Sequence, residues 1–175
     1  MKMESISSGG NFEKHPEGVF AAVCCDVYSR EKKNKYFGEV NKWSGEVDDR
    51  ETVTQVCVAF LTTELIEIDG EMKPRYASIW NSKTWAEKGN LRKAITGWCP
   101  DMDKDSVDLE DLIGRGAMLS IVHSKDGKWA NVTNISALPS GSVIPTIPET
   151  FVRQKDKPVE EEKTEATTET TDLPF

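Results

Sequence analysis

Residues 18–28 have the sequence GVFAAVCCDVY, and this stretch decides the fold class. Apolar side chains recur at every second position along it, at Val19, Ala21, Val23, Cys25 and Val27. A period of two over a run of this length predicts a long β-strand with one continuous apolar face. The adjacent Cys24 and Cys25 should point to opposite faces of that strand.

Four more strands and a helical insertion are expected downstream. Residues rich in β-formers predict strands at 53–61, extended over 64–68, and at 73–80, 117–123 and 129–138. Asp69-Gly70 is a strong signal for a hairpin turn between the second and third strands. Apolar residues at helical spacing predict a helix over 85–98, and a short helix is expected over 108–113.

This order of elements predicts a mainly β protein. Three strands, a helical insertion and a final hairpin follow the order of the five-stranded oligonucleotide/oligosaccharide-binding (OB-fold) barrel, which binds through strands two and three and the loops 1–2 and 4–5. We therefore expect a flexible arm at 1–17, an OB-fold domain at 18–140, an extended linker at 141–155, and a disordered acidic tail at 156–175.

Basic and aromatic residues occur together in the parts of the chain where this fold binds its ligand. The two loops correspond to residues 29–52 and 124–128, and both contain lysines. Such a mixture suits single-stranded nucleic acid, because cations pair with phosphates and rings stack on bases. The alternative is a solvated loop with aromatic side chains folded onto the sheet. The candidate DNA-binding residues are Arg30, Lys32, Lys33, Lys35, Tyr36, Trp43, Arg75, Tyr76, Trp80, Lys83, Lys125 and Lys128.

Two further residues are expected to be structural. Trp98 lies at the end of the predicted helix beside other apolar positions, which favours a place in the core. His123 lies on a predicted strand with no cluster of potential partners around it in the sequence.

Composition and charge exclude several classes of function. The net charge is −8, of which the tail supplies −5, so the body is not the strongly basic surface of a duplex-DNA binder. Four cysteines without a Cys-x-x-Cys pair, and two histidines, give no zinc-site spacing. We expect reduced, mostly buried thiols in a cytoplasmic protein with no membrane span, signal peptide, metal or cofactor. With no catalytic motif, we expect no enzyme activity.

The C-terminal residues Asp172, Leu173, Pro174 and Phe175 end the acidic tail with an apolar tip. A partner protein could take the Leu and Phe side chains in a pocket while its basic residues pair with the carboxylates. The tip resembles the C-terminal end of bacterial and phage single-stranded DNA-binding proteins, which finish in Asp-Ile-Pro-Phe. That resemblance implies that the tip recruits replication or recombination proteins.

The body also shows a resemblance. Ser78, Lys83, Asn90-Leu91-Arg92 and Gly97-Trp98, then Leu112-Ile113-Gly114 and Ala130-Asn131-Val132, are similar to a family of small phage-encoded proteins. These are thought to be barrel-type single-stranded DNA-binding or replication proteins, which implies a chain that coats single-stranded DNA in a bacterial host cell and can form a homo-oligomer. The alternative is an adaptor or assembly protein whose barrel binds another protein and whose tail only increases solubility.

Overall fold

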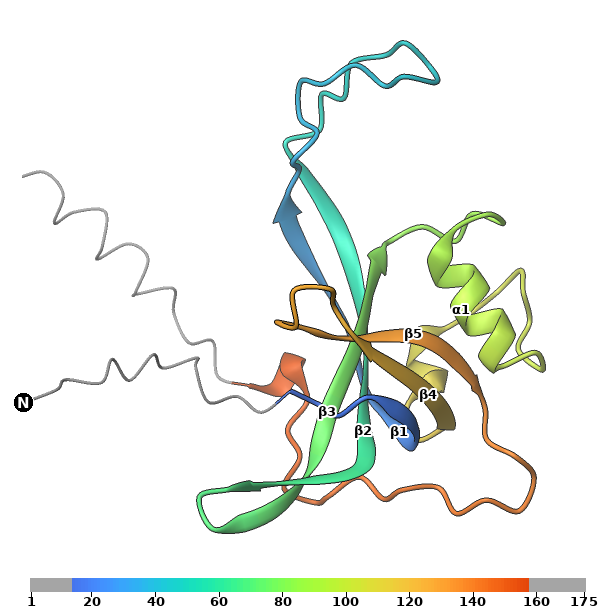
Figure 1. Ribbon diagram of the computed structural model, residues 1–175. Helices are drawn as coiled ribbons and strands as arrows, with labels where there is room; N and C mark the ends of the chain where they lie inside the picture. Colours follow the sequence, from blue (N-terminus) through green and yellow to red (C-terminus); the bar gives the residue numbers. More distant parts are fainter. Residues whose placement is uncertain (1–13, 158–175) are drawn as a thin grey trace, which may run out of the picture.

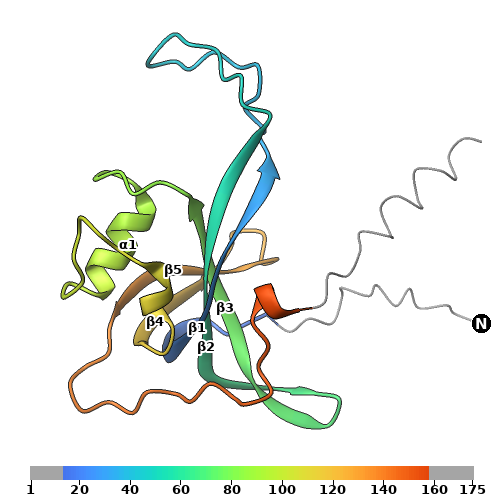
Figure 2. The same ribbon diagram turned by 180° about the vertical axis from the view of Figure 1, so that it is seen from behind.

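The chain forms a five-stranded antiparallel sheet with one α-helix (Figures 1 and 2). This computed structural model describes residues 14–157; residues 1–13 and 158–175, which contain most of the expected tail and its tip, lie outside the described residues. The strands run in the spatial order β3-β2-β1-β4-β5, and α1 lies between β3 and β4 in the sequence. The elements are β1 (Gly18–Lys33), β2 (Thr52–Ile68), β3 (Glu71–Ser82), α1 (Asn90–Trp98), η1 (Leu109–Leu112), β4 (Gly116–His123), β5 (Ala130–Ala137) and η2 (Gln154–Asp156).

Two boundaries differ clearly from those expected. Strand β1 continues to Lys33 instead of ending near residue 28, because residues 29–33 pair with 52–56 of β2 beyond the edge of the core. Helix α1 starts at Asn90 instead of Trp85, whose indole Nε1 donates a hydrogen bond to the carbonyl oxygen of Lys104 (2.7 Å). The Asp69-Gly70 turn is confirmed, and its two positive φ angles, 52° and 80°, are those of a type I′ hairpin.

Strand β1 contributes to two apolar clusters on opposite faces of the sheet. The pairing register with β2 shifts between Cys24 and Asp26, so Cys25 is the extra residue of a β-bulge. As expected, Cys24 and Cys25 face opposite sides, one in each cluster. The expected single apolar face is wrong, since the bulge moves Val27 to the side of Cys24 while Val23 stays with Cys25.

The larger cluster lies between the sheet and α1. Helix residues Leu91, Ile95 and Trp98 are spaced to share one helix face, and all three are buried against strand residues such as Phe60. The rings of Trp98 and Phe60 meet edge to face at 5.4 Å, and Trp98 Nε1 donates to the Gly116 carbonyl (2.8 Å). Trp98 is therefore a core residue, as expected. No helix within residues 14–157 is long and apolar enough to cross a membrane.

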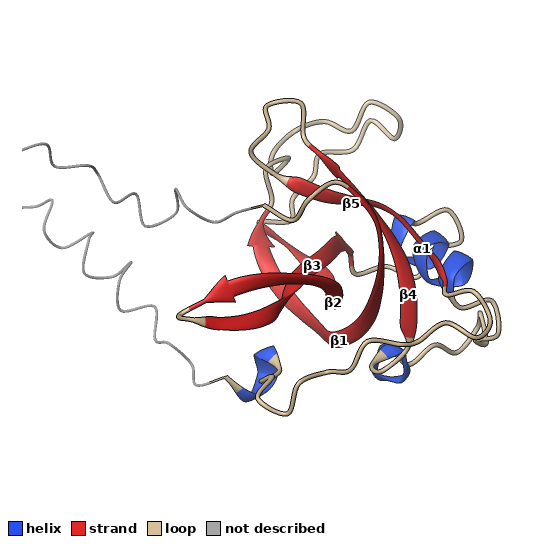
Figure 3. Ribbon diagram, turned by 60° about the horizontal axis from the view of Figure 1, so that its bottom comes forward, coloured by secondary structure: helices blue, strands red, loops and turns tan. Residues whose placement is uncertain are grey.

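The expected closed barrel is not formed. The described strands β3 and β5 are the two edges of the sheet, and each is hydrogen-bonded on one side only. The sheet curls, as Figure 3 shows, so that β3 and β5 approach each other without hydrogen-bonding, and α1 packs against both strands. The consequence is an open seam between β3 and β5, bordered by α1.

The last residues of the expected N-terminal arm are attached to the sheet. His15 is buried, and its Nε2 lies 2.6 Å from the Thr62 hydroxyl of β2. The His15 carbonyl in turn lies 2.8 Å from Nε2 of His123 on β4. His123 thus has a structural contact, and residues 14–17 link the two sides of the curled sheet.

The segment after β5 crosses the second apolar cluster. Residues 139–153 contain no strand or α-helix, and Ile147 and Phe151 pack on the cluster of Val23, Cys25 and Leu61. We call residues 147–157 the strap. No pattern in the sequence indicates this packing, because two isolated apolar residues among prolines carry no periodicity.

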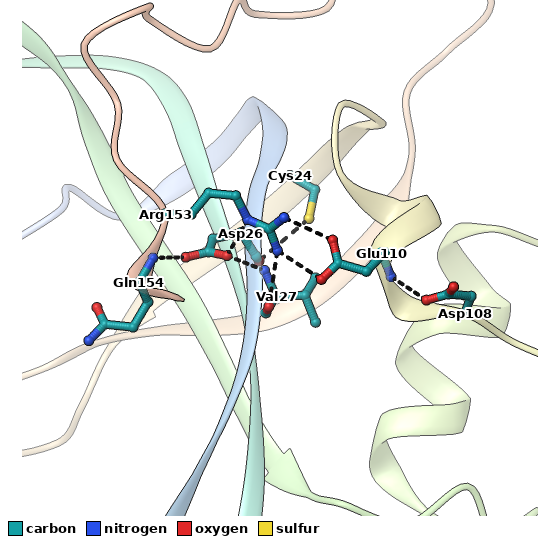
Figure 4. Close-up of polar contacts among 7 residues, drawn as sticks. All are labelled: Cys24, Asp26, Val27, Asp108, Glu110, Arg153 and Gln154. Carbon is teal, nitrogen blue, oxygen red and sulfur yellow. Dashed lines mark hydrogen bonds and ion pairs between the residues drawn. The ribbon is translucent and has the colours of Figure 1, made fainter. Parts of the chain in front are cut away.

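A buried ion pair fastens the strap to β1 (Figure 4). Asp26 has a side chain only 3% exposed, and its Oδ1 accepts a hydrogen bond from Arg153 Nε (3.0 Å). The Gln154 backbone N–H donates to the other carboxylate oxygen (2.7 Å). Arg153 also binds Glu110 of η1 through both terminal nitrogens at 2.9 Å, and this contact lowers the pKa of Glu110.

Replacing Arg153 with Ala is expected to lower the free energy of unfolding by about 1.5–3 kcal/mol, because the buried Asp26 loses its charged hydrogen-bond partner. Chemical denaturation of full-length protein measures the change. Arg115→Ala is the matched control, since its pair with Asp101 is solvent-exposed and should contribute only about 0–1 kcal/mol. An equal decrease in the free energy of unfolding of Arg153→Ala and Arg115→Ala would show that the strap is not held by this ion pair.

Acidification is expected to destabilise the attachment of residues 14–17. Burial lowers the pKa of His15 below its usual value of 6.5, and the nearby Arg75 guanidinium adds to this effect. The unfolded chain therefore takes up the proton first, and stability is lost as the pH falls from about 6.5 through the lower folded pKa. Chemical denaturation at a series of pH values measures how the free energy of unfolding depends on pH. His15→Gln should flatten this pH dependence, and His123→Gln should not. A dependence unchanged by His15→Gln would contradict this assignment.

Candidate functional site

Aromatic and cationic side chains gather on the outer face of strands β1, β2 and β3, on the side away from α1. The register aligns Tyr28, Cys57 and Trp80 across the three strands. The rings of Tyr28 and Trp80 meet edge to face at 5.5 Å, and the Arg30 guanidinium lies 3.7 Å from the centroid of the Trp80 ring. Gln55 accepts a hydrogen bond from Arg30 Nη2 at 3.4 Å. We call this cluster of Tyr28, Arg30, Gln55 and Trp80 the aromatic site.

Two phenol groups extend the aromatic site along the same face. Tyr76 of β3 is hydrogen-bonded to Tyr28, and Cys57 lies beside both. Burial raises the pKa of Tyr28 to about 12, and burial together with the Tyr28 hydrogen bond raises that of Tyr76. Both phenols therefore stay neutral at physiological pH, so this face presents hydrogen-bond donors and no phenolate charge to an anionic ligand.

Basic residues lie at the end of this face where β1 leaves the core. Lys32 is two residues beyond Arg30 and shares its side of the strand, whereas Lys33 projects from the opposite side. Lys83 follows β3, and its backbone N–H donates to the Thr54 carbonyl at 2.9 Å, which places it at the same end of the sheet. The structure thus brings Arg30, Trp80, Lys32 and Lys83 into one region.

Three other candidate residues form a separate group. Arg75 Nη1 donates to the carbonyl of Lys14 (3.3 Å), and the Lys14 ammonium donates to the carbonyl of Gly127 in the β4–β5 turn. Arg75 therefore lies close to the turn that carries Lys125 and Lys128. This second group faces away from Tyr76, because Arg75 and Tyr76 are successive residues of one strand.

Trp43 joins neither group. It lies near the tip of the β1–β2 connection, which projects well beyond the sheet (Figure 1), and its side chain is 97% exposed. We call residues 34–51 the arm. Tyr36 also belongs to the arm and is 53% exposed, with the Lys35 ammonium 4.8 Å from its ring centroid. The candidate residues Tyr36 and Trp43 thus stand apart from the aromatic site.

The charges of the arm differ from those expected of a basic loop. Residues 34–51 contain three basic and five acidic residues, a net charge of −2. The Arg50 guanidinium binds Asp48 at 2.8 Å and holds the pKa of that carboxyl well below its usual range, so Asp48 stays charged. In the β4–β5 turn, Asp126 offsets one of the two lysines, and a hydrogen bond from Ser124 lowers its pKa. Positive charge therefore concentrates at the end of β1 and not along the arm.

The sequence alone missed two members of these groups. Tyr28 ends the alternating stretch, and its opposition to Trp80 across β2 depends on the bulge at Cys25. Lys14 belongs to the N-terminal residues 1–17, which were expected to be flexible, and its contact with Gly127 joins residues far apart in the sequence. A signal for Tyr28 was available, because it is the polar aromatic residue at the end of an apolar strand.

A cavity of about 600 Å³ lies in the open seam. The cavity is lined by residues 78–81 of β3 and 131–135 of β5. Because these residues are consecutive along each strand, the free backbone edges of both strands face the cavity. Asn90, Lys93 and Ala94 of α1 form its floor. Within residues 14–157 there is no cluster of three or more His, Cys, Asp or Glu side chains that could hold a metal ion.

These groups define what the outer face can bind. Flat rings, a stacked guanidinium and two nearby lysines suit a ligand that combines planar groups with negative charge. Comparison with known proteins adds no relative from which a role could be transferred. No family model, no curated protein and no solved structure matches this chain.

Proposed function

We propose that this chain is a non-enzymatic single-stranded DNA-binding protein that coats the strand during DNA replication, recombination or repair in a bacterial host cell. The observation that carries the proposal is the Arg30–Trp80–Tyr28 cluster, with Lys32 and Lys83 at the same end of the sheet. Bases stack on aromatic rings in a sequence-tolerant way, and neighbouring cations neutralise the phosphates. The Tyr28 and Trp80 rings are both half-buried, so a base would stack on their uncovered surface, where the Arg30 guanidinium also lies.

The strand order supports the same proposal. The order β3-β2-β1-β4-β5, with a helix between β3 and β4, has the neighbour relations of an OB fold opened between its third and fifth strands. In that fold, the ligand lies across strands two and three, where Trp80 and Tyr76 are found here. The second group around Arg75 then lies at the 4–5 loop, the other position from which an OB fold contacts its ligand.

The strap limits where the strand can lie. Ile147 and Phe151 cover the half of the outer face nearest Val23 and Leu61 and reach the cluster to which Tyr28 and Trp80 belong. The proposed path for DNA therefore runs from Trp80 toward Lys32 and Lys83. The acidic tail continues from the strap in the sequence, and its carboxylates can compete with phosphates for the same lysines.

The adaptor alternative has one specific observation in its favour. The arm exposes Tyr36, Phe37, Val40, Trp43 and Val47, each more than half exposed, on a hairpin of net negative charge. Such a surface fits a protein better than a polyanion. The arm and the outer face are separate, so a protein contact at the arm is compatible with DNA binding at the aromatic site.

Replacing Trp80 with Ala is expected to weaken binding of oligo-dT by about 1–3 kcal/mol per stacked base, roughly 5- to 150-fold. Titration by intrinsic tryptophan fluorescence or anisotropy measures the loss. Trp80→Phe keeps an aromatic ring and should lose less affinity. Arg30→Lys keeps the positive charge but removes the planar guanidinium that stacks on Trp80. If Trp80→Ala folds normally by circular dichroism and binds within twofold of wild type, the outer face is not the binding site. Parallel titrations with duplex DNA and with RNA establish which nucleic acid the site prefers.

Removing residues 158–175 is expected to raise the affinity for oligo-dT by less than tenfold, about 1.4 kcal/mol at most, and chiefly at low salt, where the charges of the tail are least screened. Deleting Phe175 alone is the matched control, because it retains every acidic side chain and should leave the affinity unchanged. The two variants are compared by DNA titration at several salt concentrations. Weaker DNA binding after full truncation would contradict competition by the tail.

A further inference from the structure

The arm is an ordered hairpin that has no part in the core. Backbone hydrogen bonds connect Asn34 with Glu51, Gly38 with Asp48 and Asn41 with Glu46, and Val40 bridges to Val47. At its base, Asn34 is buried, its side-chain amide donating to the Arg50 carbonyl at 2.8 Å and its Oδ1 accepting from the Tyr36 N–H at 3.0 Å. This network fixes the shape of the arm while its apolar side chains remain exposed.

The exposed surface of the arm is larger and more apolar than a solvated loop requires. Trp43 is 97% exposed, and Phe37, Val40 and Val47 lie on the same short hairpin. Exposed apolar groups in a fixed arrangement mark surfaces that contact another macromolecule. The net charge of −2 on residues 34–51 disfavours a polyanion and favours a partner surface with positive charge.

The body of the same chain has a surface with the complementary features. The seam cavity is lined by the apolar Ile79, Ala94 and Val132 and by the edges of two strands, including Trp80, whose ring packs with Tyr28 on the outer face. Residues 83–93, which lead from β3 into α1 along the seam, contain four basic residues and one acid, a net charge of +3. Lys93 lines the cavity, and Lys88 is exposed near it in the sequence. An uncovered sheet edge is also stabilised by a segment that packs on it.

We propose that the arm of one copy docks in the seam of the next copy, with Trp43 entering the cavity and the acidic residues of the arm facing Lys88 and Lys93. The arm and the seam are different surfaces, and Figures 1 and 2 both show the arm projecting beyond the ends of β1 and β2, apart from α1 of its own chain. The contact is therefore head-to-tail, and it can repeat from copy to copy in an open line. Resting on the proposed function, such a line would make the coating of a long DNA strand cooperative.

Charge reversal tests the contact without DNA. Full-length protein is followed by sedimentation velocity at low salt over a range of concentrations. Wild type should self-associate, and two variants should not: the arm variant Glu46→Lys/Asp49→Lys and the seam variant Lys88→Glu/Lys93→Glu. An equimolar mixture of the two should associate again, with alternating copies, because every arm then faces a seam of opposite charge. Glu67→Lys/Glu71→Lys, at the β2–β3 turn, is the matched control and should associate as wild type.

Several outcomes would overturn the proposal. These are a wild-type protein that stays monomeric at every concentration, a seam variant that associates as wild type, or a mixture that remains monomeric. If only the arm variant lost association, the contact would be arm to arm and not head-to-tail. Trp43→Ala is a second probe that leaves every charge in place, and it should also abolish association.

DNA separates this role of Trp43 from base stacking. Trp43→Ala should bind an oligonucleotide that has room for one copy as tightly as wild type, and should lose the cooperative binding of wild type on a long strand. An equal loss of affinity on both lengths would assign Trp43 to DNA and remove it from the contact. If self-association follows the charge pattern but no variant binds DNA, the proposed function fails and the contact between copies stands.

Discussion

Strand β1 has to face two apolar layers within one run of residues, and the rest of the structure depends on how it does so. The bulge at Cys25 changes the phase of the strand, so that Cys24 and Val27 pack toward α1 while Val23 and Cys25 pack toward the strap. Without the extra residue, the side chains of Asp26 and Tyr28 would point to the opposite face of the sheet. The aromatic site and the attachment of the strap therefore both depend on this one irregularity.

Asp26 shows how the bulge connects β1 to the C-terminal segment. A carboxylate buried at a bulge is unfavourable unless it is paired, and here Arg153, the Gln154 N–H and the Val27 N–H satisfy it. The pairing holds Phe151 over the second cluster, which contains Val23 and Cys25. A structural need of β1 thus determines where the strap crosses the outer face.

The distribution of charge is compatible with the proposed binding of a polyanion by an acidic chain. Of the net charge of −8, the tail contributes −5 and the arm −2, whereas Arg30, Lys32 and Lys83 lie together at one end of the sheet. Screening at physiological salt limits the reach of a charge to about 8 Å, so a local cluster is effective even in a chain of the opposite overall sign. The same separation leaves the arm and the seam with opposite charges.

The sequence by itself determined which segments are strands and which part is the helix, because a period of two and a helical spacing are local properties of the chain. It also determined the Asp69-Gly70 turn, the core position of Trp98 and the opposite orientation of Cys24 and Cys25. Only the tertiary structure decided that the sheet stays open, since that depends on how closely β3 and β5, two strands distant in the sequence, approach each other beside α1. The same holds for the site, because the sequence indicated Arg30 and Trp80 only separately. Their contact, the pairing of Asp26 with Arg153 and the isolation of Trp43 were decided by the tertiary structure. They arise from strand pairing across β2 and from long-range packing, which no local pattern encodes.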